Sequence, residues 1–195
     1  MPRLEVITGP MFCGKTDELI RRLRIASYAD KKALIIKPAL DSRSGKEIAS
    51  RVKNPETNKF ERAAFLPANP VASQGDFWKL IMQARYDIIA ADEAQFFGPW
   101  FVSLIGELFD FDRRDCLEVI IAGLDMDAWR RPFGNMPIFM AIADSVTKLK
   151  AVCFKCKQPN AIFTQKLGGS GSQVEIGDAG LYEARCRKCH LIPSQ

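Results

Sequence analysis

The sequence contains no apolar run that approaches the roughly 20 residues needed to cross a membrane as a helix. Its N-terminus also lacks the charged region and the following apolar stretch that are typical of a secretory signal peptide. These absences argue against a membrane protein and against secretion. We therefore expect a soluble, cytoplasmic protein with no membrane partner.

A dense stripe of basic residues is also missing. Lys and Arg number 28 against 23 Asp and Glu, which gives a mild net charge of +5. Apart from short groups such as Arg21-Arg22 and Arg113-Arg114, the basic residues are scattered, as is typical of solvated surfaces. A nucleic-acid-binding face would gather them. No nucleic-acid partner is expected.

Histidine occurs once and cysteine only six times. Without a secretion signal, the cysteines predict reduced thiols or a metal site rather than disulfides. Four of them form two C-x-x-C pairs separated by 29 residues, and two such pairs can close one tetrahedral Zn²⁺ site. The predicted metal ligands are Cys153, Cys156, Cys186 and Cys189.

The separation of the two pairs exceeds the usual range of a zinc ribbon, so an inserted loop is expected between them. This stretch contains the flexible composition Gly-Gly-Ser-Gly-Ser at residues 168–172. His190 follows Cys189 directly and is interpreted as a bystander to the metal. The remaining thiols, Cys13 and Cys116, are predicted to be buried and apolar rather than reactive.

The sequence GPMFCGKT near the N-terminus fits the P-loop pattern G-x-x-x-x-G-K-[ST]. Gly9 and Gly14 let the backbone turn its N–H groups toward phosphate oxygens. Lys15 brings a positive charge to the β- and γ-phosphates of ATP, and the Thr16 hydroxyl can bind Mg²⁺. The residues predicted to bind the nucleotide here are Gly9, Pro10, Met11, Phe12, Cys13, Gly14, Lys15 and Thr16.

The flanking residues supply the context that this motif requires. Residues 4–8 form a β-prone run, and Leu19, Leu23 and Ala26 then recur at helical spacing. The predicted helix begins near Gly14 and directs the positive end of its dipole at the phosphates. The alternative interpretation is a glycine-rich turn in an ordinary α/β domain.

A second motif, which consists of two acidic residues, follows a predicted strand at residues 86–91. Asp92 at the end of such a strand would face the P-loop and help to hold Mg²⁺. The adjacent Glu93 would lie near the transferred phosphate, where it could take a proton from an attacking hydroxyl or water. The alternative is an acidic pair that caps the next helix.

Strands and helices alternate along residues 1–150. Further strands are predicted at 33–37, 63–66 and 117–124, with helices at 76–85 and after residue 100. This alternation predicts an α/β fold with a mainly parallel sheet. The polar stretch 38–58 shows no periodicity and is predicted to be a long loop over the active site. The composition changes near residue 153, so we expect a nucleotide-binding domain (1–150) and a zinc-binding domain (151–195).

Together these motifs resemble the cellular-type thymidine kinases. The resemblance rests on the P-loop, on DEAQFF after a strand, on LDMD before PFG, and on the KLKAVC run into two C-x-x-C pairs. It covers nearly the whole chain. It implies a RecA-like P-loop domain joined to a small zinc domain, which carries a loop, the lasso, that closes over the nucleoside. The implied reaction transfers the ATP γ-phosphate to the 5′-hydroxyl of thymidine.

The resemblance also implies roles for individual residues. Glu93 matches the catalytic base, and Asp92 matches the strand-end carboxylate that holds the metal. Gln95 is grouped with the nucleotide-binding residues at a position that lines the pocket. The implied substrate-binding residues are Leu124 and, within the lasso from residue 174 to 182, Val174, Glu175, Ile176, Gly177 and Tyr182. The usual assembly of the family implies a homotetramer.

Two positions depart from the family pattern. Many members carry His-Asp in the loop after the second strand, whereas this chain has Ala49-Ser50-Arg51. The contact that the family's Asp makes therefore cannot be assigned to this chain. Arg51 is a candidate group for neutralising phosphate charge. An aromatic residue usually follows the LDMD-like run, but here Ala128 takes that place and Trp129 comes next. We therefore expect a nucleoside pocket that differs from the family's and binds thymidine less tightly per contact.

Two other classes of function compete with the kinase. One is a P-loop ATPase with a zinc ribbon that binds nucleic acid, in which Glu93 would activate water. The long glycine-bearing insertion and the missing basic stripe speak against it. The other is a non-catalytic nucleotide-binding module, which the presence of Glu93 beside Asp92 disfavours.

Overall fold

The computed structural model describes residues 2–54, 56–57, 59–111, 117–168 and 180–193. The elements in chain order are β1 (Arg3–Thr8), α1 (Lys15–Ser27), β2 (Ala33–Pro38), β3 (Glu47–Lys53), β4 (Phe60–Pro67), β5 (Asn69–Val71), α2 (Gln74–Ile81), β6 (Ile88–Ala91), η1 (Ala94–Phe96), α3 (Trp100–Phe111), β7 (Glu118–Gly123), α4 (Met136–Ile142), β8 (Ser145–Lys148), β9 (Phe163–Lys166) and β10 (Tyr182–Arg185).

The central sheet has six strands in the order β5-β2-β6-β7-β1-β8, and every neighbouring pair in it is parallel. The inner strands of this sheet are the apolar runs predicted at 86–91 and 117–124; β6 has four buried residues out of four, and β7 has five out of six. Parallel strands covered on both faces favour such continuous apolar sequences. The predicted α/β class with a mainly parallel sheet is confirmed.

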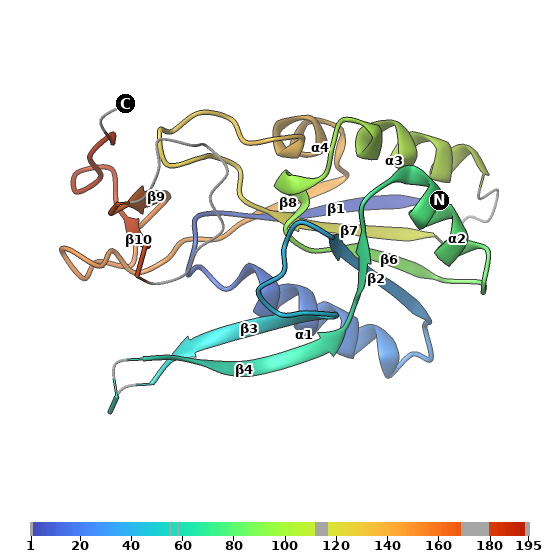
Figure 1. Cartoon of the computed structure of the whole chain (residues 1–195), viewed down its shortest axis with the longest axis horizontal. Coiled ribbons are helices and arrows are strands. Elements are labelled where there is room, and N and C mark those ends of the chain that lie inside the picture. The colour runs from blue at the N-terminus through green and yellow to red at the C-terminus, as the bar shows by residue number, and fades with distance from the viewer. Residues whose placement is uncertain (1, 55, 58, 112–116, 169–179, 194–195) are drawn as a thin grey trace.

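Helices cover both faces of this sheet. One face carries α1, and the other carries α2, α3 and α4 (Figure 1). Leu19 and Leu23 of α1 are buried against the first face, as the helical spacing predicted. On the second face, Phe101 and Leu104 of α3 pack with Phe139 of α4 in the larger apolar cluster. Two separate cores therefore fix the sheet between its helices.

Residues 38–58 differ from the expected loop. Their second half forms β3, which pairs antiparallel with β4 in a hairpin that lies below α1 in Figure 1. Ile48 is buried against α1, whereas Val52 nearer the tip is 57% exposed. A two-stranded ribbon packed only at its base carries polar residues on both faces toward its tip, which removes the alternation that predicts a strand.

The C-terminal part forms a small unit at one end of the sheet. Its two strands, β9 and β10, pair antiparallel and lie near the two C-x-x-C pairs. Within the described ranges, no helix is both long and apolar enough to span a membrane. The ends of β1, β6 and β7 point toward this unit (Figure 1). The crevice at the carboxyl ends of parallel strands is where open α/β sheets bind ligands.

Candidate active site

The predicted phosphate loop joins β1 to α1. Gly9 has φ 140°, and a Cβ placed on it would lie 2.5 Å from the carbonyl oxygen of Leu149, so only glycine fits there. Gly14 has φ 84° and precedes the first residue of α1. The Lys15 ammonium donates a hydrogen bond of 2.8 Å to the carbonyl of Pro10. The loop therefore has the glycine geometry and the helix N-terminus of a phosphate site.

Asp92 lies against this loop, as predicted. The Thr16 hydroxyl donates to its Oδ2 at 3.0 Å, and the backbone N–H of Glu93 donates to its Oδ1 at 2.9 Å. Burial and the adjacent charge of Glu93 raise the pKa of Asp92, and the Thr16 bond opposes that rise. A buried carboxylate beside a second carboxylate and a hydroxyl offers the hard oxygen ligands that Mg²⁺ prefers. The residues present fit a magnesium ion.

Glu93 is held from two sides. Its Oε1 lies 2.7 Å from Nη2 of Arg43, and its Oε2 accepts a hydrogen bond of 2.6 Å from Nε2 of Gln95. The Gln95 side-chain oxygen accepts from the backbone N–H of Leu124 at 2.9 Å, so the amide is anchored to the end of β7. Gln95 is only 3% exposed and lies behind Glu93 rather than at the surface of the pocket.

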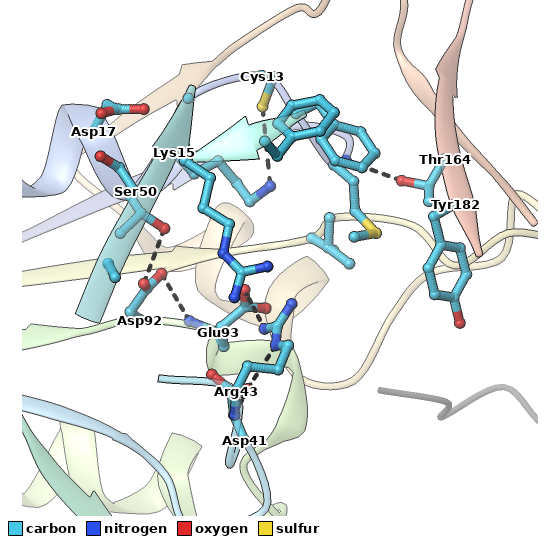
Figure 2. Close-up of a pocket in the computed structure, with 18 of the residues that line it drawn as sticks. Cys13, Lys15, Asp17, Asp41, Arg43, Ser50, Asp92, Glu93, Thr164 and Tyr182 are labelled. Carbon is cyan, nitrogen blue, oxygen red and sulfur yellow. Dashed lines mark hydrogen bonds and ion pairs between the residues drawn. The ribbon is translucent and has the colours of Figure 1, made fainter. Parts of the chain in front are cut away.

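Arg43 and Asp41 are site residues that the sequence reasoning did not assign. Figure 2 shows Arg43 between the carboxylates of Asp41 and Glu93. Its Nε donates to Oδ1 of Asp41 at 2.6 Å. These two carboxylates raise the pKa of Arg43 against the opposing effect of burial. The only sequence signal was a pair of opposite charges, Asp-Ser-Arg, in the polar stretch after β2.

One cavity of about 680 Å³ joins the phosphate loop to Glu93 and continues beyond it. Part of the cavity wall is apolar. That wall includes Phe96, Leu124, Met126, Ala128, Trp129, Phe133 and Tyr182. Leu124 and Tyr182 were predicted to bind the substrate, and they lie on this wall. Val174, Glu175, Ile176 and Gly177 were predicted with them and lie outside the described residues.

Ala128 and Trp129 both line the cavity, so the departure from the family pattern falls inside the pocket. Trp129 is half-buried, and the Lys166 ammonium lies 5.5 Å from the centre of its ring. The indole Nε1 is buried and has no hydrogen-bond acceptor within the described residues. Arg51, on β3, lines the same cavity.

The four predicted zinc ligands come together. The Sγ atoms of Cys153, Cys156, Cys186 and Cys189 all lie within 4.8 Å of one another. Burial opposes ionisation of Cys153, yet hydrogen bonds from the backbone N–H groups of Cys156 and Cys186 lower the pKa of its thiol to about 6. Four thiolate donors around one point are the ligand set of a closed structural zinc site. The cluster is thus compatible with Zn²⁺.

His190 lies outside this cluster, as predicted. Its Nδ1 accepts a hydrogen bond of 3.1 Å from Nε of Arg130, so Nε2 carries the proton and points at the carbonyl of Thr164, 3.2 Å away. Burial lowers the pKa of His190. The hydroxyl of Thr164 in turn accepts the backbone N–H of Met11 at 3.0 Å. A direct contact therefore links the phosphate loop to the cysteine-bearing unit.

The parallel sheet, the glycine loop at a helix N-terminus and the facing Asp92-Glu93 pair define the class of P-loop nucleotide-binding proteins. The chain belongs to the thymidine kinase family, because a sequence profile described as thymidine kinase matches residues 2–190. It is 43% identical over 190 residues to a thymidine kinase of Mesomycoplasma hyopneumoniae, which covers 97% of this chain and 95% of that protein. It is also 44% identical over 189 residues to a thymidine kinase of Mycoplasma mobile, covering 96% of this chain and 86% of that protein.

Proposed function

We propose that this enzyme is a thymidine kinase in which Glu93 is the general base for transfer of the ATP γ-phosphate to the 5′-hydroxyl of thymidine. One observation supports this assignment above the others. Glu93 lines the same cavity as the phosphate loop and the apolar wall. A carboxylate there can reach both a phosphate on Lys15 and a nucleoside against Leu124 and Tyr182.

The phosphate side of the site uses backbone and charge. N–H groups of the loop bind the ATP phosphates, and Lys15 exchanges its bond to the Pro10 carbonyl for a β- or γ-phosphate oxygen. Thr16 and Asp92 are the residues that would hold Mg²⁺. When bound, that ion neutralises charge on the phosphates. The N-terminus of α1 adds the positive end of its dipole.

In the chemical step, Glu93 accepts the proton of the 5′-hydroxyl while the hydroxyl oxygen forms a bond to the γ-phosphorus. The bond from that phosphorus to the bridging β-phosphate oxygen breaks, and ADP leaves with the electron pair. Gln95 and Arg43 orient the Glu93 carboxylate by one bond to each oxygen. The Arg43 guanidinium also places a positive charge beside the phosphoryl group as it is transferred.

The cysteine-bearing unit has a supporting role in this proposal. Cys153, Cys156, Cys186 and Cys189 would hold one Zn²⁺, which would stabilise the unit that contains β9 and β10. Tyr182, the first residue of β10, then closes one side of the nucleoside pocket. We further propose a domain division at residue 150 and a cytoplasmic location. We also propose a homotetramer, which light scattering of the purified protein would test.

The decisive experiment is incubation with MgATP and a panel of nucleosides. We expect thymidine 5′-monophosphate as the main product, with one ADP formed for each. ADP formed without any nucleoside monophosphate would instead support a P-loop ATPase. A matched reaction with Lys15→Met should give neither product, because the loop loses its phosphate-binding charge.

A further inference from the structure

Four charged side chains of alternating sign lead from the interior to the base. Lys37, near the end of β2, is 1% exposed. Its ammonium lies 3.2 Å from Oδ2 of Asp41. The other oxygen of Asp41 accepts from Arg43 at 2.6 Å, and Arg43 contacts Glu93 at 2.7 Å. Asp41 and Arg43 in the middle of this series thus each use a different atom for each of their two neighbours.

Burying an ammonium group is costly unless its partners are well placed. Lys37 has a second partner, the carbonyl oxygen of Glu47, at 3.3 Å. Glu47 is the first residue of β3, so Lys37 contacts both the Asp41 carboxylate and the residue where the hairpin begins. The segment that carries Asp41 and Arg43 is therefore fixed at both ends by one buried side chain.

We propose that Lys37 is a positioning residue for the phosphoryl transfer, acting through Asp41 and Arg43 on Glu93. By occupying one oxygen of Asp41, it leaves a single oxygen for Arg43. Nη2 of the guanidinium then stays directed at Glu93. This inference rests on the proposed role of Glu93 as the base.

Loss of the ammonium has a defined consequence. With both oxygens of Asp41 available, the Arg43 fork would bind that carboxylate in bidentate fashion, which is the favoured geometry of such pairs. Arg43 would then withdraw from Glu93, which Gln95 alone would hold. A displacement of about 1 Å near the reacting atoms can lower a rate roughly 100-fold.

The test is a double-mutant cycle between Lys37→Met and Arg43→Ala, with Lys46→Met as the matched control. Lys46 lies in the same segment, and its side chain is exposed. We expect Lys37→Met to lower kcat about 10- to 100-fold, with ATP and thymidine KM within about threefold of the parent. Lys46→Met should leave kcat unchanged. In the Arg43→Ala background, Lys37→Met should change kcat by less than about twofold, because coupled residues are not additive.

Two results would overturn the proposal. One is a folded Lys37→Met protein, with parental unfolding midpoint and zinc content, whose kcat is within twofold of the parent. The other is a Lys37→Met effect of equal size in both backgrounds, which would mean that Lys37 does not act through Arg43. If Lys37→Met does not fold, Lys37→Gln, which keeps a donor without the charge, takes its place in the cycle. Glu93→Gln is measured in parallel, so a failure of the base assignment is seen separately from a failure of the coupling.

Discussion

Glu93 has a left-handed backbone (φ 53°), which is unusual for a residue other than glycine. Such a conformation costs about 1–3 kcal/mol and persists where the surroundings determine it. Here the surroundings are the Arg43 and Gln95 bonds to its carboxylate and the bond from its N–H to Asp92. The turn points the Glu93 side chain into the cavity directly after a buried strand.

Replacement of this carboxylate by an amide tests its role as a base. Glu93→Gln keeps the shape but removes the proton acceptor, so kcat should fall about 10²- to 10⁴-fold. The dissociation constant of ATP should change little, because the phosphate loop is untouched. Steady-state kinetics and equilibrium ATP titration measure the two quantities. A parental kcat, with chemistry shown to be rate-limiting, would contradict the assignment.

Trp129 supplies an aromatic face where Ala128 supplies none. Lys166 lies over its ring, and the residue lines the cavity. Stacking of a base on an aromatic side chain is worth roughly 1–3 kcal/mol, so Trp129→Leu should raise thymidine KM about 5- to 150-fold with ATP KM unchanged. Trp129→Phe is the control and should be mild. If Trp129 only packs, Trp129→Leu will leave thymidine KM unchanged, and Ala128→Phe should tighten nucleoside binding.

At the scale of elements, one C-x-x-C pair precedes β9 and the other follows β10 directly. A closed four-thiolate site is structural, and its metal contributes directly to folding of the local unit. We expect one Zn²⁺ per chain. Cys156→Ser should release the metal and raise thymidine KM, because Tyr182 begins β10.

Elemental analysis and steady-state kinetics check this prediction together. Cys13→Ser is the control for metal content, since Cys13 lies outside the cluster. Protein purified without chelator that contains no zinc would refute the site. Cys156→Ser with unchanged zinc and unchanged thymidine KM would do the same.

At the scale of the whole molecule, the phosphate loop and the cysteine-bearing unit are joined. The Met11 N–H donates to the Thr164 hydroxyl of β9, and Phe12 packs against Phe154 with ring centres 5.2 Å apart. These contacts predict that a disturbance of β9 also reaches ATP binding.

Thr164→Val tests this connection. The substitution keeps the shape and removes the acceptor of the Met11 N–H, and a typical hydrogen bond contributes about 0.5–1.5 kcal/mol. ATP KM should rise about 2- to 12-fold while zinc content stays at the parental value. Thr164→Ser retains the hydroxyl and should behave like the parent. An ATP KM that is the same in both variants would mean that the bond does not support the phosphate loop.

The sequence alone determined the parts of this protein whose chemistry is local. Local patterns predicted the glycine loop, α1, the apolar strands and the strand-end Asp92-Glu93 pair. Backbone freedom, helical spacing and strand burial each depend on the types of a few neighbouring residues. The four cysteines were predictable as one cluster because each C-x-x-C pair forms a knuckle by itself. The roles of individual residues in catalysis remain predictions.

Tertiary structure alone decided how the Glu93 carboxylate is held. Asp41 and Arg43 belong to a stretch whose charges resemble those of any solvated loop, and Lys37 lies near the end of β2. All three are about fifty residues from Glu93 in sequence. They meet it because β2 and β6 are neighbours in the sheet, so that the residues after both strands share one edge. Likewise, Gln95 lies behind Glu93 because its side chain reaches the N–H that follows β7. The order of strands depends on packing across the whole chain, and no local pattern records it.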